Sequence, residues 1–453
     1  MKSQMKYVTI RFQGLFLQGF KSTRTKKINY RGEENSMNGK PPIVIDGDGH
    51  VVEVNPTYDT IEEEYYHRRP LYTQRSAGDI VRLVDGKIYG SDPESGFVGP
   101  NGNSGPPIGK AYHYRRAGTY NPWARLPDMD ADQIDVAVIY PTDELPLCVT
   151  DDVKFALARA RAYNNWLHDY CSANPGRLKG IGIIALQDVE TAIEEMRRCV
   201  VDLGMVGVQI GCTVRQDTLL SDIRLDPFWR AAEELDVPVA VHGPALPDFF
   251  RQYMDVNRPD HILEASHMAH AFAQMLACSN VITSGVLERF SKLRIAFLEA
   301  GSGWVPYWMH RMDEYNEVAP ERWAMISSEP SDYIKSGRVF FSCEPGDADM
   351  PYFLENIGEQ AMLFASDYLH FDALFVGETG HDGKPYPGTV NSLLARDDVS
   401  DSAKTKMMYD NSVAFYKNLL PKDLGKIGDP LAREEPNEVR NMEFPGTIGA
   451  RLN

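Results

Sequence analysis

The stretch VIDGDGHVVE, residues 44–53, carries Asp48 and His50 at the end of a short apolar run. Because these two residues are one position apart, a β-strand presents both side chains on the same face. Polar residues of the same kind follow three further apolar runs: His242 after VPVAV, Glu299 after IAFL and Asp367 after MLFAS. These residue types bind catalytic metals, and their spacing along the chain is that of successive strand ends.

From Ile43 onward, short β-branched runs alternate with longer helical patterns, as in a parallel βα sheet. The pattern predicts eight strands, over residues 43–48, 135–140, 180–185, 206–210, 237–241, 295–299, 339–342 and 363–366. It predicts helices over residues 153–172, 192–203, 227–235, 263–290, 305–315, 348–357 and 403–419. Eight strands predict an α/β fold of the (β/α)8 TIM-barrel type, in which all strand ends point to one rim.

Three segments lie outside this alternation. The stretch between the first two strands, residues 51–133, is a long insertion that we expect over the barrel mouth, and its GPNGNSGPP segment is too rich in turn formers for a regular element. The basic N-terminal segment is either an irregular extension or a product of translation that starts upstream of Met37. The predicted organisation is an extension, a barrel and an irregular tail, over residues 1–40, 41–420 and 421–453.

The composition of the chain excludes several classes of protein. The 453 residues carry a net charge of −17, which argues against nucleic acid or an anionic membrane as a partner. No apolar run approaches the roughly 20 residues that a membrane helix needs. The six cysteines lack CxxC spacing and fall mostly in apolar segments, which is typical of free thiols in a reducing cytoplasm. We therefore expect a cytoplasmic enzyme that acts on a small molecule.

Buried carboxylates and imidazoles at a barrel rim are costly unless they are paired or bound to a metal. One divalent cation would satisfy all of the strand-end residues together. The sequence therefore predicts a metal site formed by Asp48, His50, His242 and Asp367. The alternative is that these side chains hydrogen-bond only to one another.

The chain resembles the amidohydrolase superfamily, in the branch of aminocarboxymuconate-semialdehyde decarboxylase and the resorcylate decarboxylases. The resemblance covers about residues 43–419 and rests on four motifs: VIDGDGHVVE (44–53), VHG (241–243), GVLERFSKLRIAFLEAG (285–301) and ASDYLH (365–370). It implies that Asp48 and His50 are the ligand pair of the first strand and that His242 is the ligand of the fifth. Asp367 is then the ligand of the eighth strand and the base toward metal-bound water.

The motifs depart from that branch in three ways. Asp48 stands where the first ligand is often His, and Glu299 stands at the sixth-strand position that often carries His. The fourth strand, residues 206–210, has no Lys that could be carboxylated to bridge two metals. A second metal would therefore need other ligands, and the candidates are Glu53, Glu299, His267, His270 and His370.

Each of these candidate residues has an alternative role. His267 and His270, three residues apart on one predicted helical face, either bind metal or line the helix near the mouth. Glu299 is either a ligand or a hydrogen-bond acceptor for a ligand histidine. His370 either binds a substrate carboxylate or orients Asp367. Candidates for substrate contact are Arg68, Arg69 and Trp304, with a solvated surface pair and core packing as the alternatives.

Two reaction classes follow. With one zinc, manganese or iron ion, Asp367, His242 and His370 are the predicted catalytic residues for hydrolysis or non-oxidative decarboxylation of a small organic acid. With two iron or manganese ions, oxygen activation becomes possible, and the Asp-x-His and LEAG motifs are similar to those of non-haem diiron or manganese–iron monooxygenases on this fold. A third reading is a catalytically inactive partner subunit. The resemblance also implies a homodimer or a pairing with a homologous subunit.

Overall fold

The computed structural model describes residues 40–76, 79–89, 91–92, 97–98, 116–215, 218–243, 262–323, 325–368, 370, 373–380 and 382–417. The predicted N-terminal extension, apart from Lys40, and the predicted tail after residue 420 lie outside the described residues. So does the turn-rich segment over residues 99–107.

Eight parallel strands form one sheet in the order β1-β7-β8-β9-β10-β11-β12-β13. Their bounds are β1 Ile45–His50, β7 Val136–Tyr140, β8 Leu178–Ile183, β9 Gly207–Ile210, β10 Val239–Val241, β11 Ile295–Phe297, β12 Val339–Cys343 and β13 Met362–Phe364. The sheet curls into a nearly closed barrel, because the Asp367 N–H donates to the Asp48 carbonyl at 3.0 Å and the His50 N–H to the Tyr368 carbonyl at 2.7 Å. The predicted (β/α)8 barrel is confirmed.

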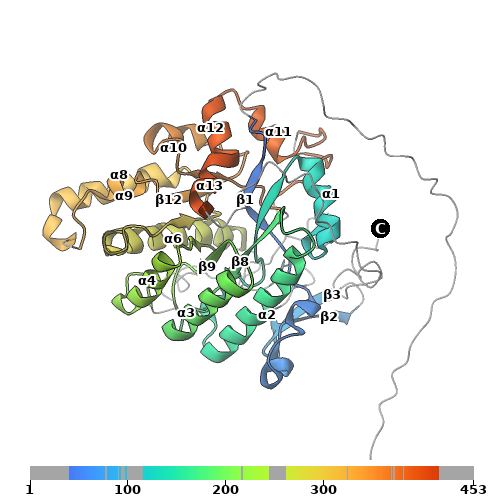
Figure 1. The fold of residues 1–453 in the computed structure, drawn as a ribbon. Coiled ribbons are helices and arrows are strands. Elements are labelled where there is room, and N and C mark those ends of the chain that lie inside the picture. The colour runs from blue at the N-terminus through green and yellow to red at the C-terminus, as the bar shows by residue number, and fades with distance from the viewer. Residues whose placement is uncertain are drawn as a thin grey trace, which may run out of the picture. The chain divides into compact units, whose positions relative to one another are not determined.

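Helices follow the strands and pack on the outer face of the barrel (Figure 1). Their bounds are α2 Val153–Cys171, α3 Val189–Arg197, α4 Asp226–Glu234, α6 Ile262–Thr283, α7 Val286–Arg289, α8 Trp304–Val318, α9 Pro330–Ile334, α10 Met350–Asn356, α11 Thr389–Leu394, α12 Asp401–Thr405 and α13 Asn411–Tyr416. The helix predicted over residues 263–290 is interrupted, because Gly285 has a left-handed φ of +74°. The helix predicted over residues 403–419 is interrupted by a π-helical turn at Lys406–Asp410. Among the described residues, no helix has the length and apolar character that a bilayer crossing requires.

The strands divide their side chains between two buried clusters. Alternate residues such as Val138, Ala240 and Leu363 form one cluster with Phe415 and Tyr416 of α13. Their neighbours, including Ile139 and Val241, pack instead against the surrounding helices. Strands buried on both faces explain the nearly continuous apolar runs in the sequence.

The insertion after β1 contains regular structure that the sequence analysis does not predict. The antiparallel strands β2 Leu71–Ser76, β3 Asp79–Val84 and β4 Lys87–Tyr89 form a small sheet. Helix α1, Pro122–Asp132, then leads back to the barrel; the Asn121 side chain caps it by accepting from the Trp123 N–H. Arg82 of β3 is completely buried against Asp143 and Glu144, which follow β7 at the carboxyl end of the barrel. The insertion therefore contacts the rim on which the predicted metal ligands lie.

Candidate metal centre

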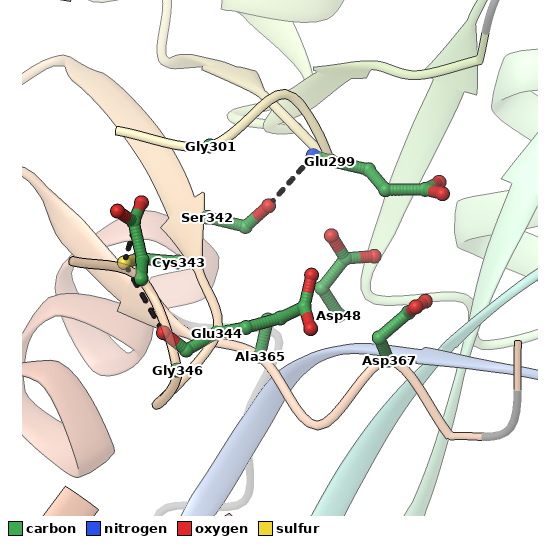
Figure 2. A pocket seen from close by; sticks show the side chains of 10 residues that line it. Asp48, Glu299, Gly301, Ser342, Cys343, Glu344, Gly346, Ala365 and Asp367 are labelled. Carbon is green, nitrogen blue, oxygen red and sulfur yellow. Dashed lines mark hydrogen bonds between the residues drawn. The ribbon is translucent and has the colours of Figure 1, made fainter. Parts of the chain in front are cut away.

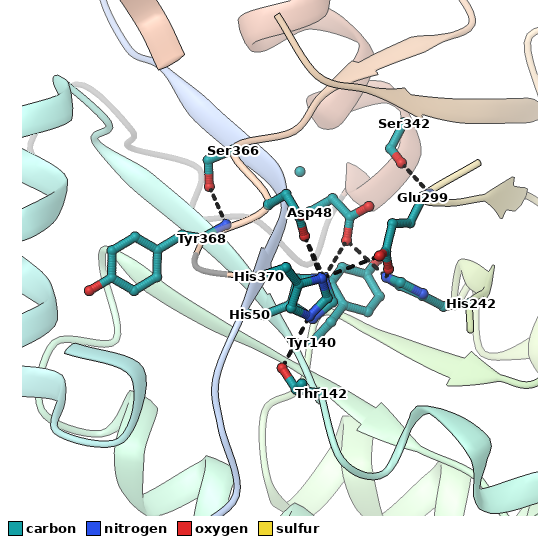
Figure 3. A network of polar contacts seen from close by, with 12 residues as sticks. Asp48, His50, Tyr140, Thr142, His242, Glu299, Ser342, Ser366, Tyr368 and His370 are labelled. Carbon is teal, nitrogen blue, oxygen red and sulfur yellow. Dashed lines mark hydrogen bonds and ion pairs between the residues drawn. The ribbon is translucent and has the colours of Figure 1, made fainter. Parts of the chain in front are cut away.

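The predicted ligands come together at the carboxyl ends of the strands (Figure 3). Asp48 and His50 belong to β1, and His242 follows β10 directly. Glu299 follows β11, and Asp367 follows β13. Segments that are up to about 320 positions apart in the chain thus contribute to one site, as the parallel barrel requires.

Asp48, His50 and His242 form the first group of potential metal-binding atoms. The Oδ1 atom of Asp48 lies 3.2 Å from Nε2 of His242 and 3.4 Å from Nε2 of His50. All three side chains are buried. Atoms that bind one cation at about 2.0–2.2 Å lie about 3–4.4 Å apart, so these distances fit one metal ion.

His50, Glu299, Asp367 and His370 form a second group, which shares His50 with the first. The Oδ1 atom of Asp367 lies 3.5 Å from Nε2 of His50 and 2.7 Å from Nδ1 of His370. Oε1 of Glu299 lies 3.3 Å from the same Nδ1 atom of His370. The donor set is therefore large enough for one ion or for two adjacent ions.

The hydrogen bonds of His50 fix which ring nitrogen carries its proton. Nδ1 lies 2.7 Å from the carbonyl oxygen of Pro141, which can only accept, so Nδ1 is the donor. The lone pair of a neutral ring is then on Nε2, which faces the carboxylates of Asp48 and Asp367. Among the described residues, this buried Nε2 atom has no hydrogen-bond partner. Burial and the neighbouring His370 lower the pKa of His50 to about 4, which disfavours a second proton on the ring.

His370 is held in a similar way to His50: one ring nitrogen bonds to the turn after β7, and the other faces carboxylates. The Thr142 hydroxyl donates to the Val51 carbonyl at 2.7 Å, so its oxygen accepts the Nε2 proton of His370 at 3.2 Å. Nδ1 of His370 then faces the carboxylates of Asp367 and Glu299. Two imidazoles thus aim lone pairs at carboxylates, an arrangement that needs protons or cations between them. The donor set fits a divalent metal.

The carboxylates differ in their protonation. Burial alone would raise the pKa of Asp48, but the imidazoles of His242 and His50 outweigh it and lower that pKa well below its usual range. Burial, opposed by His370 and reinforced by the charge of Glu299, raises the pKa of Asp367 well above its usual range. Burial would lower the pKa of His370, but Asp367 and Glu299 raise it. Asp48 is therefore ionised, whereas the pair of Asp367 and His370 retains a proton.

Two residues of the site have a left-handed backbone. Glu299 has a φ of +52° and Asp367 a φ of +48°, which residues other than glycine rarely adopt. The Glu299 N–H donates to the Ser342 hydroxyl at 2.9 Å, and the Asp367 N–H donates to the Asp48 carbonyl. Strain of this kind, held by surrounding hydrogen bonds, is concentrated at functional sites.

A pocket of about 130 Å³ opens beside the cluster (Figure 2). Its lining includes Asp48, Glu299, Asp367 and, in addition, Glu344, whose carboxylate Figure 2 shows turned toward the same space. Glu344 follows β12 directly, and the sequence analysis does not identify it. The sequence feature that could have identified Glu344 is its position as an acidic residue directly after the seventh strand of the barrel.

The candidates for a second metal lie in different surroundings. Nδ1 of His270 donates to the Glu299 carbonyl at 3.0 Å and lies 3.7 Å from Oε1 of Glu299. His267 belongs to the same helix, α6, but its side chain lies outside the described residues. Glu53 accepts the backbone N–H groups of residues 142–144, after β7.

The three candidates for substrate contact all have partners within the protein. Arg68 pairs with Asp85 at 2.6 Å and with Asp152 at 2.7 Å. The guanidinium group of Arg69 lies 3.6 Å from the centre of the Tyr66 ring. Trp304 is nearly buried, and its ring meets that of Phe341 edge to face. The positive charge of Arg68 is thus balanced within the insertion and its neighbours.

Comparison with known sequences identifies similar proteins. A family model described as Amidohydrolase (Amidohydro_2) matches residues 45–417. The chain is 26% identical over 268 residues to a 2-amino-3-carboxymuconate-6-semialdehyde decarboxylase from Dictyostelium discoideum, a match that covers 57% of this chain and 70% of that one. It is 31% identical over 200 residues to a gamma-resorcylate decarboxylase from Rhizobium sp. strain MTP-10005, covering 42% of this chain and 59% of that one.

Solved structures share the fold. An amidohydrolase from Mycobacterium avium subsp. paratuberculosis superposes with a TM-score of 0.65 at 21% identity, over 83% of this chain and 99% of that one. A 5-carboxyvanillate decarboxylase from Novosphingobium aromaticivorans, crystallised with manganese and 3-methoxy-4-hydroxy-5-nitrobenzoic acid, gives a TM-score of 0.56 at 20% identity, over 83% of this chain and 97% of that one. At this identity the structures support the fold alone.

Proposed function

We propose that this chain, which belongs to the amidohydrolase family and to its branch of carboxymuconate-semialdehyde and resorcylate decarboxylases, is a metal-dependent decarboxylase of a small organic acid. The observation that carries the proposal is the pair of buried imidazoles, His50 and His370, each of which turns one ring nitrogen toward carboxylates while its other nitrogen is held by Pro141 or Thr142. Asp48, His50, His242 and Asp367 would hold the ion. Zinc, manganese and iron all accept this mixture of nitrogen and oxygen ligands.

The acidity of the pocket supports a role for the cation in substrate binding. Asp48, Glu299, Glu344 and Asp367 all line the same small pocket. These side chains would repel a carboxylate substrate, so an anion needs a positive charge at the rim to bind there. When bound, a divalent cation supplies that charge and stabilises the negative charge that develops as the carbon–carbon bond breaks.

The side chains of Asp367 and His370 supply the proton that the reaction requires. Loss of carbon dioxide leaves an electron pair on carbon, and a proton must be added there. The Oδ1 atom of Asp367 and the Nδ1 atom of His370 lie 2.7 Å apart, and the two side chains retain a proton between them. Asp367 lines the pocket, so we infer that this pair is the general acid. Hydrolysis would use the same carboxylate as a base toward water.

The test combines metal analysis with a substrate screen. Protein from cells supplied with balanced zinc, manganese, iron and cobalt is assayed for ions per chain and for release of carbon dioxide from small aromatic and unsaturated acids. One ion per chain with carbon dioxide release supports the proposal. The Asp367→Asn variant should be inactive, whereas Asp382→Asn, at a carboxylate that is 62% exposed, should keep full activity.

A second candidate function is an oxygen-dependent hydroxylase with two iron or manganese ions. The specific observation in its favour is the second group of potential ligand atoms, from His50, Glu299, Asp367 and His370, which adjoins the first. Carboxylate-rich sites favour iron or manganese over zinc. About two such ions per chain, together with substrate-dependent oxygen consumption and no carbon dioxide release, would select this candidate.

A further inference from the structure

We propose that Glu53 is a positioning residue, which fixes the ring orientation of both His50 and His370, and the tautomer of His50, by holding the turn after β7. The turn consists of residues 141–144. Glu53 follows β1 by three positions and is completely buried. Although its residue type suits a metal ligand, its contacts indicate a different role.

Both carboxylate oxygens of Glu53 accept backbone N–H groups from the turn. Oε2 accepts from Thr142 at 3.3 Å and from Asp143 at 2.9 Å, and Oε1 accepts from Glu144 at 3.1 Å. Three consecutive N–H groups directed at one carboxylate form an anion-binding concavity. Glu53 therefore determines where this short stretch of backbone lies.

The same turn holds the two imidazoles. The Pro141 carbonyl takes the Nδ1 proton of His50 at 2.7 Å, and the Thr142 hydroxyl takes the Nε2 proton of His370 at 3.2 Å. The centres of the two rings lie 3.8 Å apart, with the ring planes tilted by 35°. A displacement of the turn would move both acceptors and would release both rings from their present orientations. Groups that orient ligand histidines in this way commonly change metal affinity by about 10- to 100-fold.

The side chains of the turn are held from the other side. Arg159 pairs with Glu144 at 2.7 Å, and Arg82 of the insertion lies 3.4 Å from the Asp143 carboxylate. Arg82 also lies 3.3 Å from Glu144. These two guanidinium groups balance the acidic side chains around Glu53. The turn is thus fixed between the carboxylate of Glu53 and two arginines.

The test compares Glu53→Gln with Glu195→Gln. Glutamine at position 53 keeps the length of the side chain but replaces one accepting oxygen with an NH₂ group, which cannot accept the N–H groups. Glu195 is the matched control, because it is equally buried and accepts from Asn164 and Arg198, both at 2.7 Å, outside the site. Both variants are labelled with ¹⁵N-histidine and studied without metal, with ring signals assigned by His50→Asn and His370→Asn.

In the wild-type protein and in Glu195→Gln we expect His50 protonated at Nδ1 and not at Nε2, and we expect one set of ring signals for His370, with Nε2 protonated. In Glu53→Gln we expect His50 to become a mixture of tautomers and the Nε2 signal of His370 to shift, because the acceptors of both rings have moved. A folded Glu53→Gln protein with wild-type ring signals would overturn the proposal. If that variant does not fold, Thr142→Val tests the same relay, and unchanged His370 signals in it would likewise overturn the proposal.

A second measurement, which rests on the proposed metal-dependent function, is the dissociation constant for Co²⁺. We expect it to rise about 10- to 100-fold in Glu53→Gln and to stay unchanged in Glu195→Gln. If the wild-type protein does not bind cobalt, zinc or manganese, the proposed function fails, while the ring signals still decide the role of Glu53. Wild-type cobalt affinity in Glu53→Gln would contradict the positioning role.

Discussion

The Nε2 atom of His50 lies 3.5 Å from the Oδ1 atom of Asp367, and within the described part of the chain this buried Nε2 atom has no hydrogen-bond partner. The opposite nitrogen of His50 donates to the Pro141 carbonyl, so Nε2 has no proton of its own to offer to the carboxylate. A lone pair facing a carboxylate in a buried site is unfavourable. A cation between the two atoms would turn this repulsion into ligation.

Metal binding should therefore stabilise the fold. Removal of metal by a chelator should lower the melting temperature, and adding back manganese, zinc or iron should restore it. A ligand at 100 times its dissociation constant contributes about 2.7 kcal/mol to the free energy of unfolding. Thermal unfolding at increasing metal concentration measures this stabilisation. A melting temperature independent of metal in the wild-type protein would contradict the predicted centre.

His242→Ala and Asp367→Ala should each remove metal and activity together. Each deletes a donor atom and leaves the remaining buried charges unbalanced, so we expect metal affinity to fall by more than the roughly 100-fold typical of an indirect partner. Metal content after dialysis and turnover under saturating substrate are the measurements. If either variant kept its full metal content and activity, the metal site would not lie at this rim.

Glu299→Gln should distinguish one ion from two. The substitution keeps the size of the side chain but removes the charge that lies 3.3 Å from Nδ1 of His370 and 3.6 Å from Nε2 of His242. If two ions bind, we expect the variant to retain one of them. If one ion binds to Asp48, His50, His242 and Asp367, the metal content should stay unchanged while the pH profile of turnover shifts.

Asp46→Asn should become more stable relative to the wild-type protein as the pH rises. Burial raises the pKa of Asp46 from 3.8 to about 6, although the Ser366 hydroxyl and N–H donate to it. The folded state thus gains from a neutral Asp46 below about pH 4 and loses that gain as the pH rises through about 6. Asparagine is neutral throughout, so the difference in unfolding free energy between variant and wild type should grow by about 2 kcal/mol from pH 4 to pH 7.

Urea unfolding at several pH values measures this difference. The exposed Asp382→Asn variant is the control and should show a difference that does not change with pH. A pH-independent difference for Asp46→Asn would mean that the carboxylate is ionised in the fold across this range.

Gly49→Ala should destabilise the first strand between its two potential ligands. A Cβ atom at position 49 would lie 2.5 Å from Oδ2 of Asp46 and 2.9 Å from Nη2 of Arg125. Overpacking of this kind costs about 1–3 kcal/mol. Gly346→Ala is the control, because a Cβ atom there meets nothing within 4 Å. Equal stability of the two variants in urea would show that β1 adapts without strain.

The sequence predicted much of the fold. Each of the eight strands was expected within about two residues of its observed start, because burial on both faces leaves a local apolar pattern. The small sheet β2–β4 was not predicted, because its short strands lie in a polar insertion and are stabilised by partners far away in the chain, such as Arg82 with Asp143.

The grouping of the site residues also followed from the sequence. Asp48, His50, His242, Glu299 and Asp367 each follow or end a strand, and a parallel barrel brings all such positions to one rim. The family membership expected from these motifs is confirmed by the match over residues 45–417. Metal binding itself stays a prediction.

By itself, then, the sequence determined which residues reach the rim, because strand periodicity and chain order are local properties. Only the tertiary structure decided what each of them does there. His50 and Pro141 are 91 positions apart, yet their contact fixes the tautomer, and Glu53 binds a turn about 90 positions away. Glu344 likewise lines the pocket because of the path that the chain takes after β12. Hydrogen bonds are directional and short-ranged, so the partners of a buried polar atom depend on the folded arrangement of distant segments.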